Sequence, residues 1–76
     1  MIHEHDNVVL TTDMPSSELL AGDVGTVIHV YDEGRAYEVE FISFEGDTET
    51  ILTLEADKVR PVRAHEIPHV RELAVS

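Results

Sequence analysis

Histidine is the residue type whose number and spacing in this sequence first suggest a specific chemistry. Five of the 76 residues are His, and four of these lie near the two ends of the chain. Neutral imidazole is a common ligand of Zn, Ni and Cu, so a cluster of these side chains would be able to bind such a metal. The four residues concerned are His3, His5, His65 and His69.

A shared metal site would require both ends of the chain to meet. His3 and His5 would lie on one side of an extended segment, because side chains there repeat every second residue. His65 and His69 would align on a helix, although Pro68 disfavours that helix. Such a site would hold Zn or Ni, whereas in the simpler interpretation these histidines contact only water and the protein has no cofactor. Oxygen ligands for the metal would come from Glu4, Asp6 and Glu66.

Negative charge is the second outlier. The chain has 16 acidic residues against five Lys and Arg, and its formal net charge is -11. Fourteen of the acids and a single base, Arg35, lie in residues 1–57, whereas residues 58–76 hold four bases and two acids. This charge opposes direct binding to nucleic-acid phosphates or to an anionic membrane. The sequence therefore predicts either a solvated acidic surface or an acidic face that docks on a basic protein.

The acidic residues gather in segments expected to form loops and turns. Tyr31 and Phe44 lie beside these turns, as lids on the core or as exposed anchors for a partner. Charge at the rim of an interface speeds association, and a buried aromatic side chain holds the complex. An antitoxin-like or accessory protein would act in this way. The acidic residues predicted to contact the partner are Asp13, Glu18, Asp32, Glu33, Glu45 and Asp47.

Catalytic patterns are not recognisable, so we expect a non-enzymatic protein. Ser16 and Ser17 have no base nearby in sequence, and Gly22-x-x-Gly25 lacks the Lys and the helix of a phosphate-binding loop. The chain contains no cysteine, which fits a cytoplasmic location. No apolar run approaches the roughly 20 residues of a membrane span.

Strand-type residues dominate the elements that would carry these side chains. The clearest predicted strand is 36–43, in which Tyr37, Val39 and Phe41 face the core while the glutamates between them face water. A loop over 13–22, turns at 32–35 and 45–47, and a 3₁₀ turn at 55–57 separate the predicted strands. These strands are 7–12, 23–31, 36–43, 48–54 and 58–62.

This succession predicts an all-β fold, a small five-stranded SH3-like barrel over residues 1–62. A five-stranded oligonucleotide-binding barrel usually carries a helix between its third and fourth strands, and only four residues separate these strands here. Residues 63–76 form a C-terminal extension, as a short helix, an added strand or a partly ordered tail. Exchange of this extension between two copies would give a homodimer, which is a third functional alternative.

Three segments also resemble a known family. They are Leu20-Ala21-Gly22-Asp23-Val24-Gly25-Thr26-Val27, Tyr37-Glu38-Val39-Glu40-Phe41 and Leu54-Glu55-Ala56-Asp57-Lys58-Val59-Arg60-Pro61-Val62. Together they are similar to short bacterial proteins that form domain-of-unknown-function family 4926, over about residues 6–62. The first segment is also similar to SH3-like barrels with a G-x-x-G-x-V turn, such as KOW modules and the nitrile hydratase β-subunit barrel. The resemblance implies a fold and no catalytic residues.

Overall fold

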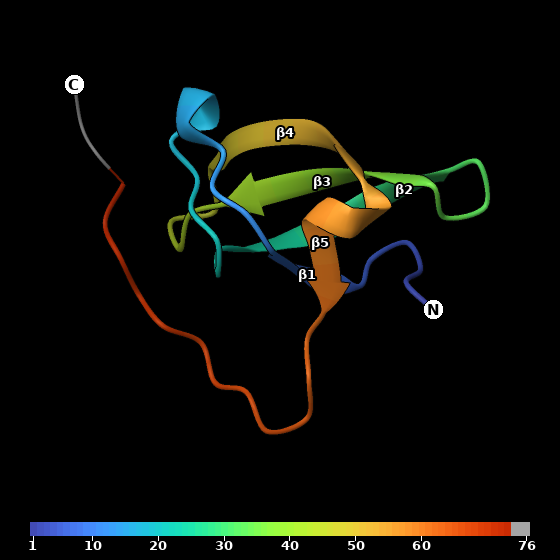
Figure 1. Ribbon diagram of the computed structural model, residues 1–76. Coiled ribbons are helices and arrows are strands. Elements are labelled where there is room, and N and C mark those ends of the chain that lie inside the picture. The colour runs from blue at the N-terminus through green and yellow to red at the C-terminus, as the bar shows by residue number, and fades with distance from the viewer. Residues whose placement is uncertain (74–76) are drawn as a thin grey trace.

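Five antiparallel strands form one sheet in the computed structural model, which describes residues 1–73 (Figure 1). Two 3₁₀ turns accompany the strands, η1 (Pro15–Ser17) before β2 and η2 (Ala56–Lys58) before β5. The strands are β1 (Asn7–Leu10), β2 (Val24–Tyr31), β3 (Ala36–Ile42), β4 (Thr48–Glu55) and β5 (Val59–Pro61).

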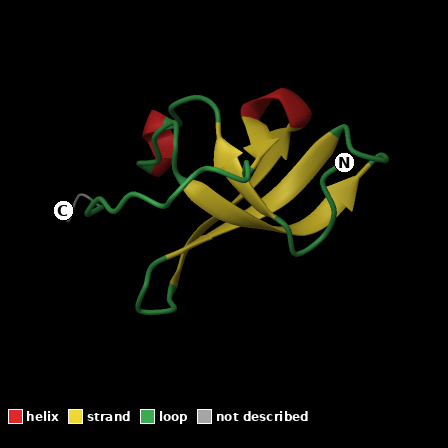
Figure 2. Cartoon of the chain, turned by 90° about the horizontal axis from the view of Figure 1, so that it is seen from below, coloured by secondary structure: helices red, strands yellow, loops and turns green. Residues whose placement is uncertain are grey.

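The strand order confirms the predicted all-β, SH3-like arrangement. The sheet runs β4-β3-β2-β1-β5, so the last strand of the chain pairs with the first. Val9 lies opposite both Val24 of β2 and Arg60 of β5. Figure 2 shows the strands crossing one another, as they do in a strongly twisted and curved sheet. The 3₁₀ turn expected before the last strand is present as η2.

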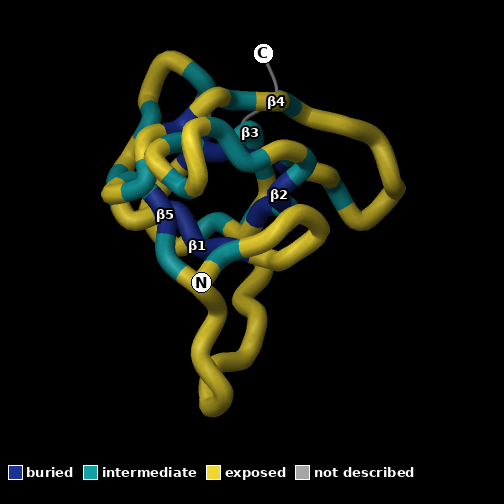
Figure 3. Tube along the Cα trace, turned by 90° about the vertical axis from the view of Figure 1, so that its right-hand side faces the viewer, coloured by how far each residue is buried: buried dark blue, intermediate teal, exposed yellow. Residues whose placement is uncertain are grey.

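The core lies on the concave side of this sheet and follows the predicted alternation. In β3, Tyr37, Val39 and Phe41 are buried, and the residues between them are only partly covered. Their partners across the β3–β4 ladder, Leu54, Leu52 and Thr50, face the same side. Figure 3 shows the buried stretches of the strands gathered around the middle of the fold. The buried cluster comprises Val8, Leu10, Leu19, Val27, Tyr37, Val39, Phe41, Leu54 and Val59.

Gly25 leaves space on β2 for side chains from β3. A Cβ atom at this position would lie 2.5 Å from Val39 Cγ1 and 2.9 Å from Phe41 Cε1, inside van der Waals contact. The absence of a side chain at Gly25 therefore makes room for these two core side chains. A register shift also occurs nearby, between Val27 and His29, where β2 bends along β3.

The loop between β1 and β2 is more ordered than its sequence suggested. Pro15 begins the short η1 turn, and Met14 and Leu19 form an isolated bridge around it. Glu18 ends the turn in the left-handed conformation, with φ of 59°. Leu19 then enters the core, where its exposed fraction is 3%. This loop is thus anchored by one buried side chain.

The C-terminal extension has neither helix nor strand between residues 62 and 73, so only the irregular tail of the three forms considered for it appears there. Figure 1 shows this segment leaving β5 and returning along the outside of the sheet. Residues 74–76 of the predicted extension lie outside the described residues. No helix among residues 1–73 is long and apolar enough to cross a membrane.

Candidate protein-docking surface

The residues predicted to contact a partner fall into two groups at opposite ends of the sheet. Because neighbouring strands are antiparallel, the β1–β2 loop and the β3–β4 turn lie at one end, and the β2–β3 turn lies at the other (Figure 1). The first group is Asp13, Glu18, Phe44, Glu45 and Asp47; the second is Tyr31, Asp32 and Glu33. The structure therefore does not bring all of the predicted contact residues together.

Several of these residues have local structural roles. Asp13 accepts a hydrogen bond from the backbone N–H of Ala21 at 2.9 Å, which closes the base of the β1–β2 loop. Asp32 and Glu33 both have positive φ in the β2–β3 turn, and Gly34 follows them with φ of 103°. The side chains of both acids are exposed. The turn geometry thus directs two adjacent negative charges into solvent.

The two candidate aromatic anchors differ in their surroundings. Phe44 is 92% exposed at the β3–β4 turn, so it is no lid on the core. Tyr31 is partly buried, its ring packs edge-on against His29, and its hydroxyl donates to Glu38 Oε1 at 2.7 Å. This hydrogen bond to the Glu38 carboxylate raises the pKa of Tyr31. Phe44 is therefore the freer of the two for contact with a partner.

A surface between the two groups was not singled out as a site from the sequence. In the β3–β4 register, Glu38 lies opposite Thr53 and Glu40 lies opposite Ile51, so these side chains share the face turned away from the core. Glu55 continues the alternation at the end of β4. We call this surface the acidic outer face, and it consists of Glu38, Glu40, Ile51, Thr53 and Glu55.

The acidic outer face has little positive charge in its surroundings. Arg35 is the single Lys or Arg between residues 24 and 55. Thr48 donates to Glu40 Oε2 at 2.6 Å, which leaves the carboxylate charge in place. Glu49 adds a further exposed carboxylate beside Thr48, where the β3–β4 register shifts. Strands β3 and β4 thus carry a group of carboxylates around Ile51, which is 48% exposed.

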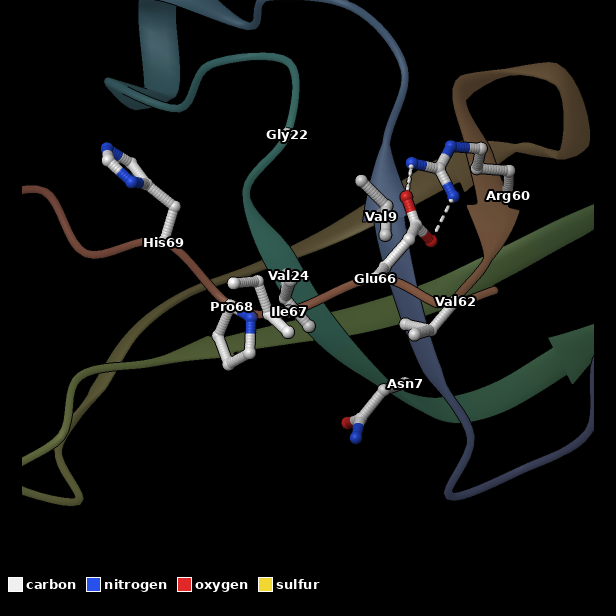
Figure 4. Close-up of a pocket in the computed structure, with 10 residues that line it drawn as sticks. All are labelled: Asn7, Val9, Gly22, Val24, Arg60, Val62, Glu66, Ile67, Pro68 and His69. Atoms are coloured by element: carbon white, nitrogen blue, oxygen red, sulfur yellow. Dashed lines mark hydrogen bonds and ion pairs between the residues drawn. The ribbon is translucent and has the colours of Figure 1, made fainter. Parts of the chain in front are cut away.

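The tail, residues 62–73, is held against the rest of the chain by two paired arginines, Arg60 and Arg71. Arg60 donates to both carboxylate oxygens of Glu66, and the backbone N–H of Arg63 donates to the same carboxylate at 2.7 Å. These contacts, chiefly the one with Arg60, lower the pKa of Glu66 to about 2. Figure 4 shows this pair at the rim of a groove of about 320 Å³ between the tail and the outer side of β1 and β2.

A second ion pair, between Arg71 and Asp23, holds the end of the described tail. The Arg71 guanidinium donates to both oxygens of Asp23 and to the carbonyl oxygen of Glu18. The pKa of Asp23 is lowered, mainly by Arg71, although partial burial opposes the shift. Two of the four bases of residues 58–76 are thus engaged within the chain.

The histidines do not form a ligand cluster in the described part of the chain. His5 has φ of 74°, so the segment around His3 and His5 is a turn rather than the expected extended strand. His3 lies beside Asp6, with Nδ1 3.9 Å from the carboxylate. His65 and His69 are exposed in the tail. Within residues 1–73, no three His, Asp or Glu side chains are placed to hold a metal ion together.

The fold and this surface define the class of protein: a small all-β barrel domain with an acidic outer face. A family model described as Domain of unknown function (DUF4926) matches residues 4–61, and the chain belongs to that family. The match covers all five strands and ends before the tail, residues 62–73. No curated protein and no solved structure matches this chain.

The glutamates of the outer face could be found only in part from the sequence. Alternation in β3 places Glu38 and Glu40 toward water, as expected. Their position beside Ile51 and Glu55 on the sheet depends on the β3–β4 register, which the sequence alone does not determine. The sequence pattern that could have predicted this face is the alternation of inward and outward side chains in both strands, which a short turn joins.

Proposed function

We propose that this protein is a non-enzymatic, cytoplasmic binding module whose acidic outer face docks on a basic protein, as an antitoxin-like or accessory protein would. The observation that carries the proposal is the register that gathers Glu38, Glu40 and Glu55 around Ile51 on one side of the sheet. An acidic surface with an apolar residue in it suits a partner that presents Lys and Arg around an apolar contact.

The acidic turns would form the rim of this interface. Glu45 and Asp47 lie at one end of the sheet, and Asp32 and Glu33 lie at the other. Exposed charges at a rim mainly steer the encounter and are screened by salt. Phe44, which is almost fully exposed, would serve as an anchor at one end.

Affinity capture from lysate of the source cells tests the proposal. Wild-type protein is expected to retain a basic protein at low salt and to lose it at high salt. The double variant Glu40→Lys/Glu55→Lys should fail to retain it, and Phe44→Ala should release it faster. A matched control, Glu45→Lys/Asp47→Lys, makes the same change in net charge at the turn. If no basic protein is captured, or if the outer-face variant captures it equally well, the proposal is wrong.

A further inference from the structure

The two edges of the sheet differ in how open they are to another strand. β5 is three residues long and ends in Pro61, which has no N–H to offer. β4 is eight residues long, contains no proline or glycine, and pairs only with β3 within residues 1–73. Long unpaired edge strands are templates for an additional strand unless they are shortened, covered or interrupted.

The free backbone groups of β4 can be identified from the ladder. Ala56 donates its N–H to the Arg35 carbonyl oxygen at 3.0 Å, in line with the β3–β4 pairing. In an antiparallel pair, residues alternate between those that exchange hydrogen bonds with the partner and those that point away. The backbone N–H and C=O groups of Leu54 and Leu52 therefore point to β3. Those of Ile51 and Thr53 point to the open edge of the sheet. The side chains of Ile51 and Thr53 lie on the acidic outer face.

We propose that this edge of β4 binds an extended basic segment of the partner as a sixth, antiparallel strand. This inference rests on the proposed function and specifies how the partner is recognised. Side chains of an added strand would lie directly opposite those of β4 on the same face. A basic residue would face Glu55, while β-branched residues would face Ile51 and Thr53.

A second copy of this chain fits the edge less well. If two β4 strands paired about Leu52, Glu49 of each copy would lie opposite Glu55 of the other. Like charges directly opposite in a sheet are destabilising. Glu38 and Glu40, in the next strand, add to the negative charge on that side. Charge complementarity therefore selects a basic segment as the occupant.

A synthetic peptide tests this mode of binding. The probe is acetyl-Lys-Val-Thr-Leu-Val-Ser-Arg-amide, whose odd-numbered residues carry the side chains for the outer face. Binding should slow hydrogen exchange at the N–H groups of Ile51 and Thr53 at least tenfold. N-methylation of the third and fifth peptide residues, which would face β4, should weaken affinity at least tenfold. N-methylation of the second and fourth residues, which would point away, is the matched control and should weaken it less than threefold.

The outcomes separate this inference from the proposed function. Equal binding by both methylated peptides, with loss of binding to Glu40→Lys/Glu55→Lys, would overturn strand addition and leave the acidic face as the docking surface. Absence of peptide binding would also overturn strand addition, and the capture experiment would then judge the proposed function alone. Protection of Ile51 and Thr53 that rises with protein concentration in the absence of peptide would assign the edge to a second copy and contradict the basic occupant.

Discussion

Arg71 and Asp23 join the C-terminal tail to the start of β2 through a two-point contact across 48 residues of sequence. Nε of Arg71 donates to Oδ1 of Asp23 at 2.9 Å, and Nη2 donates to Oδ2 at 2.5 Å. The planar guanidinium matches the two carboxylate oxygens in a way that lysine does not. The family match covers residues 4–61, so this contact joins Asp23 inside the match to Arg71 outside it.

Replacement of Arg71 by Leu is expected to free the distal tail while the barrel remains folded. The contact is near the surface, so its loss should change the free energy of unfolding only slightly. Heteronuclear NMR relaxation of Val70 and Leu73 would report the gain in mobility. Arg63→Leu removes the same charge from a side chain with no hydrogen bond among residues 1–73, and should leave Val70 and Leu73 unchanged. Equal mobility in both variants would contradict the role of Arg71.

The contact between Glu66 and Arg60 gives the tail a specific pH dependence. The pKa of Glu66 is about 2, against 4.5 for an unperturbed glutamate. Because the folded state lowers this pKa, the contact contributes fully above pH 4.5 and weakens as the pH falls toward 2. Carbon-detected NMR titration of the Glu66 carboxyl group should place its midpoint near pH 2. In Arg60→Gln the midpoint should rise toward 4.5, and a wild-type midpoint already near 4.5 would refute the contact.

Gly25→Ala is expected to destabilise the barrel by about 1–3 kcal/mol, because its methyl group would overlap Val39 and Phe41. Chemical denaturation of the variant would measure this loss. Val39→Ala removes one of the overlapping groups, so it should cost less in the Gly25→Ala background than in the wild type. If Gly25→Ala is as stable as the wild type, the packing of Val39 and Phe41 against Gly25 is not as described.

Much of the fold was predictable because the strands carry strong local signals. Tyr37, Val39 and Phe41 alternate with glutamates, and this pattern located both the core side and the solvent side of β3. The η1 turn was not predicted because three residues are too few to show a helical repeat of apolar side chains. Pro15, at its first position, is nevertheless typical of the start of a helical turn. The burial of Leu19 follows from that turn and was missed with it.

The candidate surface was less predictable because it depends on register and on contacts between distant residues. Glu45 and Glu33 look alike in the sequence, yet they lie at opposite ends of the sheet. The pairing of Arg71 with Asp23 needs the path of the tail, which no local pattern encodes. Likewise, the turn at His5 removes the extended geometry on which the predicted alignment of His3 and His5 depended.

Association kinetics between this protein and its captured basic partner test whether the acidic outer face is the docking surface. Glu40→Lys/Glu55→Lys and Glu45→Lys/Asp47→Lys each leave two fewer acids and two more bases than the wild type, whose net charge is -11. The outer-face variant is expected to lose affinity about 100-fold, mostly through faster dissociation. The turn variant should lose less than about tenfold, mostly through slower and less salt-dependent association. Equal losses in the two variants, or wild-type affinity in the outer-face variant, would contradict docking on the acidic outer face.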